Sequence, residues 1–190
     1  GDLSTTDKQT IYGFDDQVAS FGSGSSLRST LKVSKLKDVT AANGTVLSRT
    51  LQCTSATNDC KDNAKGWYID LPTTGERVNV DLRIAASTLV VASNIPSNEP
   101  CVSGGMGWIN YINFQTGGPV NEGPGGEGPA GVPVTDGLIM GNDLSATKDG
   151  NVTSHVSPSA YPDKPKDIPI PTTTPKPKGK RMSWRELINQ

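Results

Sequence analysis

The stretch KGWYIDLP, Lys65 to Pro72, decides the fold class of this chain. Trp67, Ile69 and Leu71 recur at every second residue, with a more polar residue between each pair. Side chains that alternate in this way point to opposite faces of a β-strand. Pro72 ends the strand because proline cannot donate a backbone hydrogen bond to a neighbouring strand. The stretch therefore predicts a β-strand whose apolar face lies in a core.

Short apolar segments closed by turn residues recur on both sides of this strand. We expect strands near residues 10–14, 27–36, 45–52, 76–84, 88–93 and 108–114. Asn43-Gly44 predicts a hairpin between two of them. The strand at 76–84 would place Val78, Val80, Leu82 and Ile84 on its core face, with Glu76 in or beside the preceding turn. The strand at 88–93 is apolar on both faces and is expected to be central.

The composition changes after residue 117. The chain has 21 glycines and 14 prolines, many of them in this part. Residues 118–133 are rich in both and predict a flexible loop, because they have little apolar surface to offset the entropy of ordering. Leu138-Ile139-Met140 is an apolar island that returns to a sheet. Residues 161–180 predict an extended, polyproline-like linker that ends in an apolar terminal segment.

These observations define the fold class as mainly β with antiparallel sheets. Four strands in about fifty residues match one blade of a β-propeller, although a small β domain gives similar spacing. We divide the chain into a β-sheet module (1–117), a Gly/Pro-rich loop region with its apolar island (118–160), and a Pro/Lys-rich linker with a docking segment (161–190). A length of 190 residues allows one ordinary domain.

Charge and hydropathy exclude several function classes. The net charge is −1, which gives no argument for nucleic acid or an anionic membrane. The sequence has no apolar run long enough to span a membrane and no signal peptide at its start, and it reads as a mature fragment or a piece of a longer chain.

The three cysteines indicate an oxidising compartment. Cys53 and Cys60 flank a short polar turn, and we predict a disulfide between them. Two reduced thiols in a surface loop are the alternative. A zinc site is a weaker alternative, because the single histidine, His155, lies far from these cysteines and has no second zinc ligand nearby in the sequence. Cys101 is free and buried, or pairs elsewhere.

Four segments, in order, resemble the C-terminal region of the PilY family of type IV pilus tip-associated adhesins and biogenesis factors. They are TIYGFDDQ (10–17), KGWYIDLPTTGERV (65–78), TLVVASNIPSNEPCVSGGMGWINYINFQTGG (88–118) and RMSWRELI (181–188). The resemblance implies an extracytoplasmic protein that passes through the periplasm to the cell surface at the pilus tip. It also implies a modified β-propeller of which this chain holds the last blades.

Family members act in pilus assembly, adhesion and twitching motility, so the implied partners are minor pilins and a host surface or receptor. The family's calcium-binding loop needs closely spaced Asp and Asn residues in an order that this chain lacks, so we predict no metal site.

The terminal segment is the predicted partner-binding site. Its candidate residues are Met182, Trp184, Arg185, Leu187 and Ile188, which would dock in a groove on this chain or on a minor pilin. A nucleic-acid patch in the basic tail is disfavoured, because acidic residues dilute it and only Trp184 could stack a base.

The aromatic residues Trp67, Tyr68 and Trp108 are interpreted as core packing residues. The segment GWINYINFQTGG is also similar to the blade repeat of quinoprotein dehydrogenases, but no set of residues that would hold a quinone is present. We therefore expect a non-enzymatic module with no cofactor or small-molecule substrate. It would serve pilus assembly and adhesion, and the main alternative is a free-standing adhesin or carbohydrate-binding module.

Overall fold

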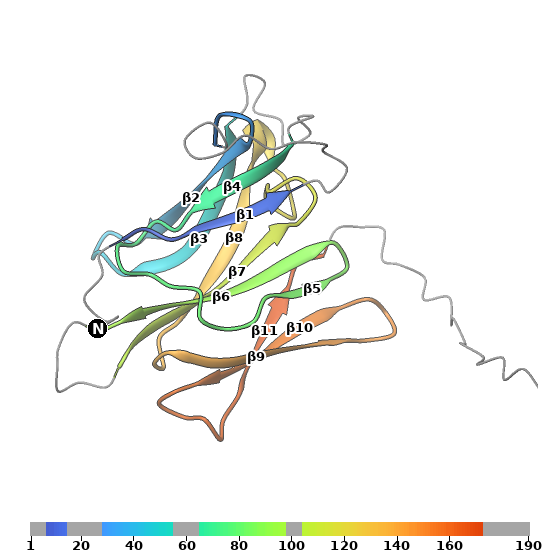
Figure 1. Ribbon diagram of the computed structural model, residues 1–190. Helices are drawn as coiled ribbons and strands as arrows, with labels where there is room; N and C mark the ends of the chain where they lie inside the picture. Colours follow the sequence, from blue (N-terminus) through green and yellow to red (C-terminus); the bar gives the residue numbers. More distant parts are fainter. Residues whose placement is uncertain (1–6, 15–27, 55–64, 98–103, 173–190) are drawn as a thin grey trace, which may run out of the picture.

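The structure, a computed structural model, describes residues 7–14, 28–54, 65–97 and 104–172 (Figure 1). The chain forms two sheets. The elements of this part are β1 (Thr10–Phe14), β2 (Lys32–Thr40), β3 (Val46–Thr54), β4 (Gly66–Asp70), β5 (Arg83–Ala85), β6 (Thr88–Pro96), β7 (Gly105–Asn113), the short 3-10 helix η2 (Pro124–Gly126), β8 (Glu127–Val134), β9 (Ile139–Ala146), β10 (Val152–Pro158) and β11 (Lys166–Ile170).

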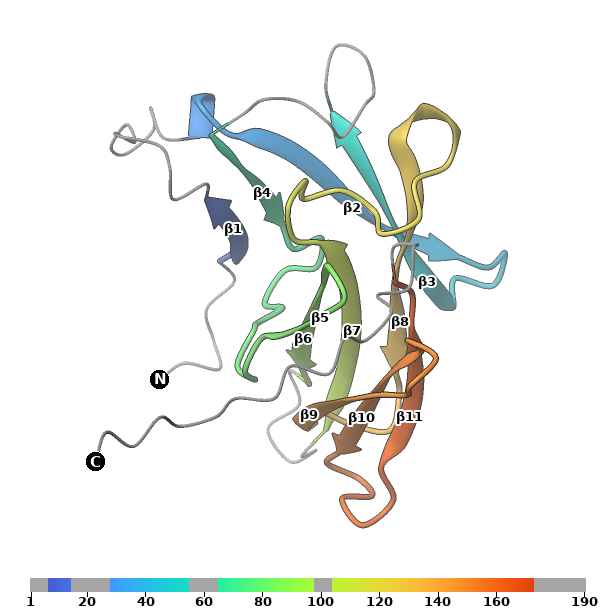
Figure 2. The same cartoon turned by 90° about the vertical axis from the view of Figure 1, so that its right-hand side faces the viewer.

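The larger sheet has eight strands in the order β1-β4-β2-β3-β8-β7-β6-β5, and the smaller has the order β11-β10-β9. Figure 2 shows the larger sheet curling into a half-barrel, with the smaller sheet against the half that contains β6, β7 and β8. The prediction of a mainly β fold is confirmed. The eight strands form one continuous sheet rather than separate four-stranded blades, so the chain has the form of a small β domain.

The predicted strand at the opening stretch is β4. Trp67 and Ile69 are buried, as is Leu71 just beyond the strand, while Tyr68 and Asp70 are half-buried. β4 pairs antiparallel with β1 on one side and parallel with β2 on the other. The β2–β4 pair is the exception to the predicted antiparallel arrangement, because a connection longer than a hairpin joins β2 to β4 through β3.

The hairpin predicted at Asn43-Gly44 joins β2 to β3. Gly44 has φ +84°, the left-handed conformation that glycine adopts without strain. The backbone N–H of Gly44 donates to the carbonyl oxygen of Ala41 (2.9 Å), and that of Thr45 donates to Asn43 Oδ1 (3.0 Å). The turn is local in sequence, which is why the dipeptide was enough to predict it.

The Gly/Pro-rich segment is not the predicted flexible loop, since residues 127–134 form β8 in the middle of the larger sheet. Two prolines are tolerated there because β8 is paired on staggered sides. Pro129 lies opposite Thr50 of β3, before the pairing with β7 begins, and Pro133 lies opposite Trp108 of β7, after the pairing with β3 has ended. Each proline therefore has a neighbouring strand on one side only.

The strand predicted at 76–84 is also wrong in extent. Only β5, residues 83–85, is a strand, and the segment before it makes a single bridge between Arg77 and Asn94. Leu82 and Ile84 are exposed, at 49% and 62%, rather than in the core. The alternating pattern was misleading because the short β5 is the edge strand of the sheet.

The polyproline-like linker predicted from residue 161 is wrong in its first part, because that part contains a strand. Residues 166–170 form β11, which pairs with β10, and Ile168 and Ile170 are buried. Pro169 is accommodated because β11 is the edge strand of the smaller sheet. The apolar island at 138–140 begins β9, as part of this second sheet.

Strand β6 separates two cores, which explains why it is apolar on both faces. Val90 and Ala92 pack in a cluster shared with the smaller sheet, which includes Ile139, Val156 and Ile168. Leu89 and Val91 point into the curl of the larger sheet, where the second cluster includes Leu51, Trp67, Ile69 and Ile112. Residues 88–93 are buried on both faces, as their apolar pattern indicates, but the expected central position is wrong, because β6 lies next to the edge strand β5 and owes its second buried face to the smaller sheet.

Candidate functional surfaces

A buried ion pair joins the two halves of the larger sheet on the inside of its curl. Arg49 of β3 and Glu76 are both fully buried, and they meet through two contacts, Nη1–Oε1 at 2.6 Å and Nη2–Oε2 at 2.8 Å. Two parallel hydrogen bonds of this kind are the strongest arginine–carboxylate geometry. The Arg49 guanidinium also lies 3.9 Å from the ring centroid of Trp108 in β7.

The remaining polar atoms around this pair are satisfied by neighbouring strands. Ser93 Oγ of β6 donates to Glu76 Oε1 (2.5 Å), and Arg49 Nη1 donates to Asn110 Oδ1 of β7 (3.1 Å). Arg49 Nε donates to Asp38 Oδ1 of β2 (2.8 Å). Because no atom of Arg49 or Glu76 reaches the surface, this network positions strands and does not bind a ligand.

An exposed aromatic surface lies at the β1 edge of the larger sheet, on β1 and β4. We call it the Tyr12 surface, and it consists of Tyr12, Phe14, Arg28 and Tyr68. The rings of Tyr12 and Phe14 stack with centroids 5.8 Å apart, and the Tyr12 and Tyr68 rings are 6.1 Å apart. Tyr12 and Phe14 are 40% and 50% exposed. β-Strand alternation places all three aromatic residues on one face, because Tyr12 is directly opposite Tyr68 in the ladder.

Arg28 holds these rings in place. Its guanidinium lies 4.6 Å from the Tyr68 ring centroid, and its Nε donates to the Tyr12 hydroxyl (3.1 Å). Its Nη2 donates to Asp70 Oδ1 (2.7 Å) and to Thr10 Oγ1 (2.7 Å). The arginine is therefore both stacked and hydrogen-bonded, which reduces the rotamer freedom that a partner would have to restrict.

The charged forms of Arg28 and Asp70 are stabilised by hydrogen bonds with each other and with Tyr12 and Thr10. The hydrogen bonds to Tyr12 and Asp70 raise the pKa of Arg28 above its ordinary value. Partial burial alone would raise the pKa of Asp70, but hydrogen bonds from Thr10 and Arg28, together with the Arg28 charge, lower it overall. Both side chains are 42% exposed, so the pair is a surface ion pair.

A hydrogen-bonded row crosses the smaller sheet at His155. His155 Nδ1 is 2.7 Å from Asp167 Oδ1, and Nε2 is 2.7 Å from Ser145 Oγ. The sequence indicated no second zinc ligand near His155, and the structure places its ring between Asp167 of β11 and Ser145 of β9. Acyl transfer by such a row also needs oxyanion donors and a substrate cleft. None of these three residues lines the cavity that contains Asp136 and Tyr161, so the order of the row alone gives no argument for catalysis.

The aromatic residues singled out from the sequence occupy different environments. Trp67 and Trp108 are 3% and 1% exposed, and Trp67 Nε1 donates to the Phe114 carbonyl oxygen (2.9 Å). Gly13 and Gly117 lie against the Trp67 ring so closely that a Cβ on either would come within 2.3 Å of it. Tyr68 is half-buried and belongs to the Tyr12 surface.

The other predicted site residues lie largely outside the described part. Cys53 is buried and disulfide-bonded. Cys60 and Cys101 lie outside the described residues, so the Cys53–Cys60 pairing stays a prediction. Met182, Trp184, Arg185, Leu187 and Ile188 lie outside as well.

Two residues were missed by sequence reasoning. Glu76 was interpreted as a turn or strand-face residue, and Arg28 received no role. A polar residue at a core-facing position, such as Asn110 in the apolar run GWINYINF, was the available signal that a buried polar network exists.

Within residues 7–14, 28–54, 65–97 and 104–172, no three His, Cys, Asp or Glu side chains lie close enough together to hold a metal ion. In the same part of the chain, no helix has the length and apolar character that crossing a membrane requires.

The arrangement defines a class of β domain in which a curled mixed sheet carries a small antiparallel sheet on one half. A solved structure with this fold is the crystal structure of the Pseudomonas aeruginosa PilY1 C-terminal domain, with a TM-score of 0.52 and 19% sequence identity. The match covers 82% of this chain and 36% of that chain, so the chain spans about a third of the solved one. The predicted resemblance to the PilY C-terminal region is thereby confirmed at the level of the fold. No protein-family model and no curated protein matches the sequence.

Proposed function

We propose that this chain is a non-catalytic module of a type IV pilus tip protein, which acts in pilus assembly and adhesion through contacts with minor pilins. The observation that carries the proposal is the likeness of its fold to the PilY1 C-terminal domain over 82% of the chain. The four sequence segments in family order, one of which contains β4, support it independently.

The terminal segment is the first candidate for the contact. Met182, Trp184, Leu187 and Ile188 are apolar residues after a Pro/Lys-rich stretch, with Arg185 among them. Tryptophan and arginine are the residue types most enriched at the energetic centre of interfaces. A short apolar segment of this kind would bind as a helix or strand in a groove of the partner.

The Tyr12 surface is the second candidate. Its stacked, exposed rings of Tyr12 and Phe14 belong to β1, an edge strand of the larger sheet, and Arg28 hydrogen-bonds to Tyr12. An edge strand can pair with an extended partner segment through its backbone, while exposed side chains confer specificity. The rings are already ordered, so binding would lose little side-chain entropy.

The test is calorimetric titration of the whole chain with the soluble domains of the minor pilins. Three variants separate the candidates: a chain that ends before Met182, Tyr12→Ala, and Tyr161→Ala as a matched exposed tyrosine on the smaller sheet. We expect the truncation to abolish binding with an unchanged circular dichroism spectrum.

If only Tyr12→Ala weakened binding, the contact would move from the tail to the Tyr12 surface and the proposal would stand. Absence of binding by the unmodified chain would overturn the assembly role and favour the free-standing adhesive module. An absorption spectrum with a bound chromophore would overturn the non-catalytic assignment, because the quinoprotein alternative requires one.

A further inference from the structure

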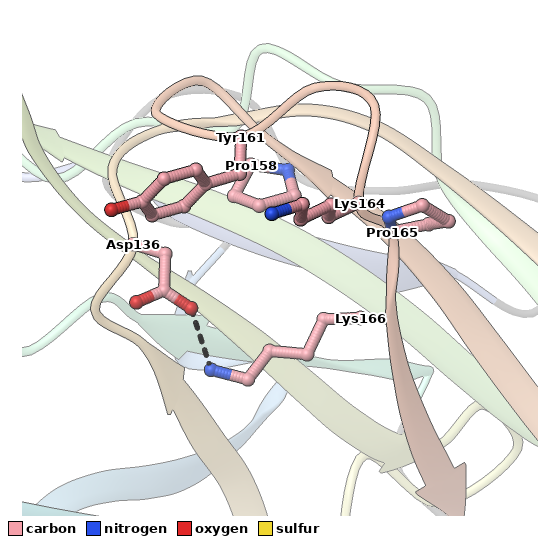
Figure 3. Close-up of a pocket in the computed structure, with 6 residues that line it drawn as sticks. All are labelled: Asp136, Pro158, Tyr161, Lys164, Pro165 and Lys166. Atoms are coloured by element: carbon pink, nitrogen blue, oxygen red, sulfur yellow. Dashed lines mark hydrogen bonds and ion pairs between the residues drawn. The ribbon is translucent and has the colours of Figure 1, made fainter.

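A cavity of about 420 Å³ opens at the end of the smaller sheet, where the segment before β9 meets the loop between β10 and β11. Figure 3 shows the Tyr161 ring on one side of it and the ion pair of Asp136 and Lys166 on the other. Its volume falls in the range of roughly 300–1,000 Å³ that small-molecule sites occupy. The lining residues are Asp136, Pro158, Tyr161, Lys164, Pro165 and Lys166.

The loop that forms this cavity is shaped by two successive turns. The backbone N–H of Tyr161 donates to the carbonyl oxygen of Pro158 (3.2 Å), and that of Lys164 donates to the carbonyl oxygen of Tyr161 (3.0 Å). The N–H of Ala160 donates to the carbonyl oxygen of Asp136 (3.2 Å), which ties the loop to the opposite wall. These hydrogen bonds fix the backbone that carries Tyr161 and Lys164 beside the segment at Asp136.

Close packing fixes the same two segments from the other side. Gly137 has φ +103°, and a Cβ there would lie 2.4 Å from Ser159 Oγ. Ser159 Oγ accepts from the N–H of Leu138 (2.9 Å), and the N–H of Ser159 donates to the Leu138 carbonyl oxygen (2.7 Å). Backbone hydrogen bonds therefore hold the two segments that form the cavity together.

The chemistry of the lining combines an apolar platform with an excess positive charge. Tyr161 is 53% exposed, and Lys164 Nζ lies 5.9 Å from its ring centroid. Lys166 Nζ is paired with Asp136 Oδ2 at 2.9 Å, so its charge is matched. No carboxylate of the described residues pairs with Lys164, and the lining therefore has one ammonium group more than it has carboxylates.

A ligand that satisfies this lining needs an apolar ring face, hydroxyl groups and one negative charge. An aromatic ring flanked by prolines packs against the C–H face of a sugar ring. The Asp136 carboxylate accepts hydrogen bonds from sugar hydroxyls, and the ammonium of Lys164 pairs with a carboxylate as a point charge. We propose that this cavity binds a carboxylated sugar residue, of the hexuronate or sialic acid type.

This site is separate from the minor-pilin contact proposed above, because it uses neither the tail nor the Tyr12 surface. The two proposals are tested with different probes. Tyr161→Ala is the control in the minor-pilin titration, and Tyr12→Ala is the control in the sugar-binding test. Either can therefore fail alone.

Ligand-observed saturation-transfer NMR with the whole chain tests the proposal. The probes are glucuronic acid and N-acetylneuraminic acid, with glucose as the neutral analogue and acetate as the free carboxylate. We expect at least one acidic sugar to bind, and glucose and acetate to bind about tenfold more weakly or not at all. Equal binding of glucose and the acidic sugars would overturn the charge argument, and equal binding of acetate would leave only a non-specific anion site.

Variants assign the contact to the cavity. We expect Tyr161→Ala to abolish binding and Lys164→Gln to weaken it about fivefold, the scale of one exposed ion pair. Both side chains are exposed, so neither change should alter the circular dichroism spectrum. Lys148→Gln, at an exposed lysine outside the cavity, and Tyr12→Ala are the controls and should bind normally. Unchanged binding by Tyr161→Ala and Lys164→Gln would show that the sugar binds elsewhere and would overturn the proposal.

Discussion

Glu76 is the residue whose role depends most on its surroundings. Both of its carboxylate oxygens contact the Arg49 guanidinium, and neither residue is exposed. Breaking a buried ion pair by removing one partner leaves an uncompensated charge in the interior, which typically costs about 3–5 kcal/mol. The value of the pair therefore lies in keeping β3, β6 and β7 in register, since an apolar replacement of both partners could be equally stable.

We predict that Glu76→Gln lowers the free energy of unfolding by about 3 kcal/mol, because Arg49 keeps its charge and retains only the partly exposed Asp38 as a counter-ion. Urea denaturation followed by tryptophan fluorescence measures the change. Glu122→Gln, at an exposed glutamate, is the matched control and should change the free energy by less than about 0.5 kcal/mol. A loss below about 1 kcal/mol for Glu76→Gln would mean that water reaches Arg49.

The pKa of Asp70 predicts a pH dependence at the same scale. Its pKa is lowered in the folded chain, so the folded state binds fewer protons there than the unfolded state. The stabilisation is present above the unfolded value near pH 4 and is lost as the pH falls through the lower, folded value. Because the pair is half-exposed, the effect should be under about 1 kcal/mol.

The measurement compares the unfolding free energy of the original chain and Asp70→Asn between about pH 6 and pH 2. The difference between the two should shrink on acidification. A difference that stayed constant over this range would show that the Arg28–Asp70 pair contributes nothing to stability.

At the scale of elements, the β5–β6 hairpin is the strained connection. Ala85 pairs with Thr88, which leaves Ala86 and Ser87 as a two-residue turn, and both have positive φ, +47° and +68°. This is the backbone of a type I′ turn, where asparagine and glycine are preferred because other residues are disfavoured at positive φ. Here alanine and serine occupy it.

We predict that the double substitution Ala86→Asn, Ser87→Gly raises the free energy of unfolding by about 1 kcal/mol, since it removes strain at two positions. Thermal denaturation followed by circular dichroism would detect the change. Ser48→Gly, in the interior of β3, is the control and should destabilise the chain. A destabilised double variant would mean that the packing of Ala86 against the core contributes more than the strain costs.

The strands themselves differ in how far the sequence predicts them. β4 and the β2–β3 hairpin depend on neighbouring residues, namely the alternation from Trp67 to Leu71 and the Asn43-Gly44 turn. β8 does not, since its small residues have little apolar pattern. Gly131 lies between Arg49 and Asn110, with a Cβ position only 3.3 and 3.0 Å from their side chains, so a small residue is needed where the sheet halves meet. From its composition alone, the Gly/Pro-rich segment of β8 is predicted to be flexible. Between β3 and β7, the same small residues are needed for close packing.

At the scale of the whole molecule, the two cores share β6 and should unfold together. Val90 faces the core that contains the smaller sheet, and Val91 faces the core inside the curl; both are fully buried. A strand shared by two cores transmits the loss of either one to the other. Because the two cores share this strand, we expect the domain to unfold in one transition.

We predict that Val90→Ala and Val91→Ala each lower the free energy of unfolding by about 2 kcal/mol, because each removes two buried methyl groups. Both variants should still unfold in one transition, at a lower temperature. Differential scanning calorimetry measures this, with the ratio of calorimetric to van't Hoff enthalpy as the test of one transition. Val39→Ala, at an exposed valine of β2, is the control. Two separated transitions, of which each variant moves only one, would show that the smaller sheet folds independently.

The class of the fold and its local parts could be predicted from the residues alone. These parts are the mainly β architecture, the strand at KGWYIDLP, the hairpin at Asn43-Gly44 and the two apolar faces of β6. Each depends on residues close together in the chain, where alternation and turn chemistry act directly. Four features became visible in the folded chain: the central place of β8, the burial of Glu76 with Arg49, the partners of His155 and the cavity at Tyr161. The physical reason is that pairing, burial and charge compensation depend on strands that are distant in sequence, so the same residues are a loop, a turn or a linker until those strands meet.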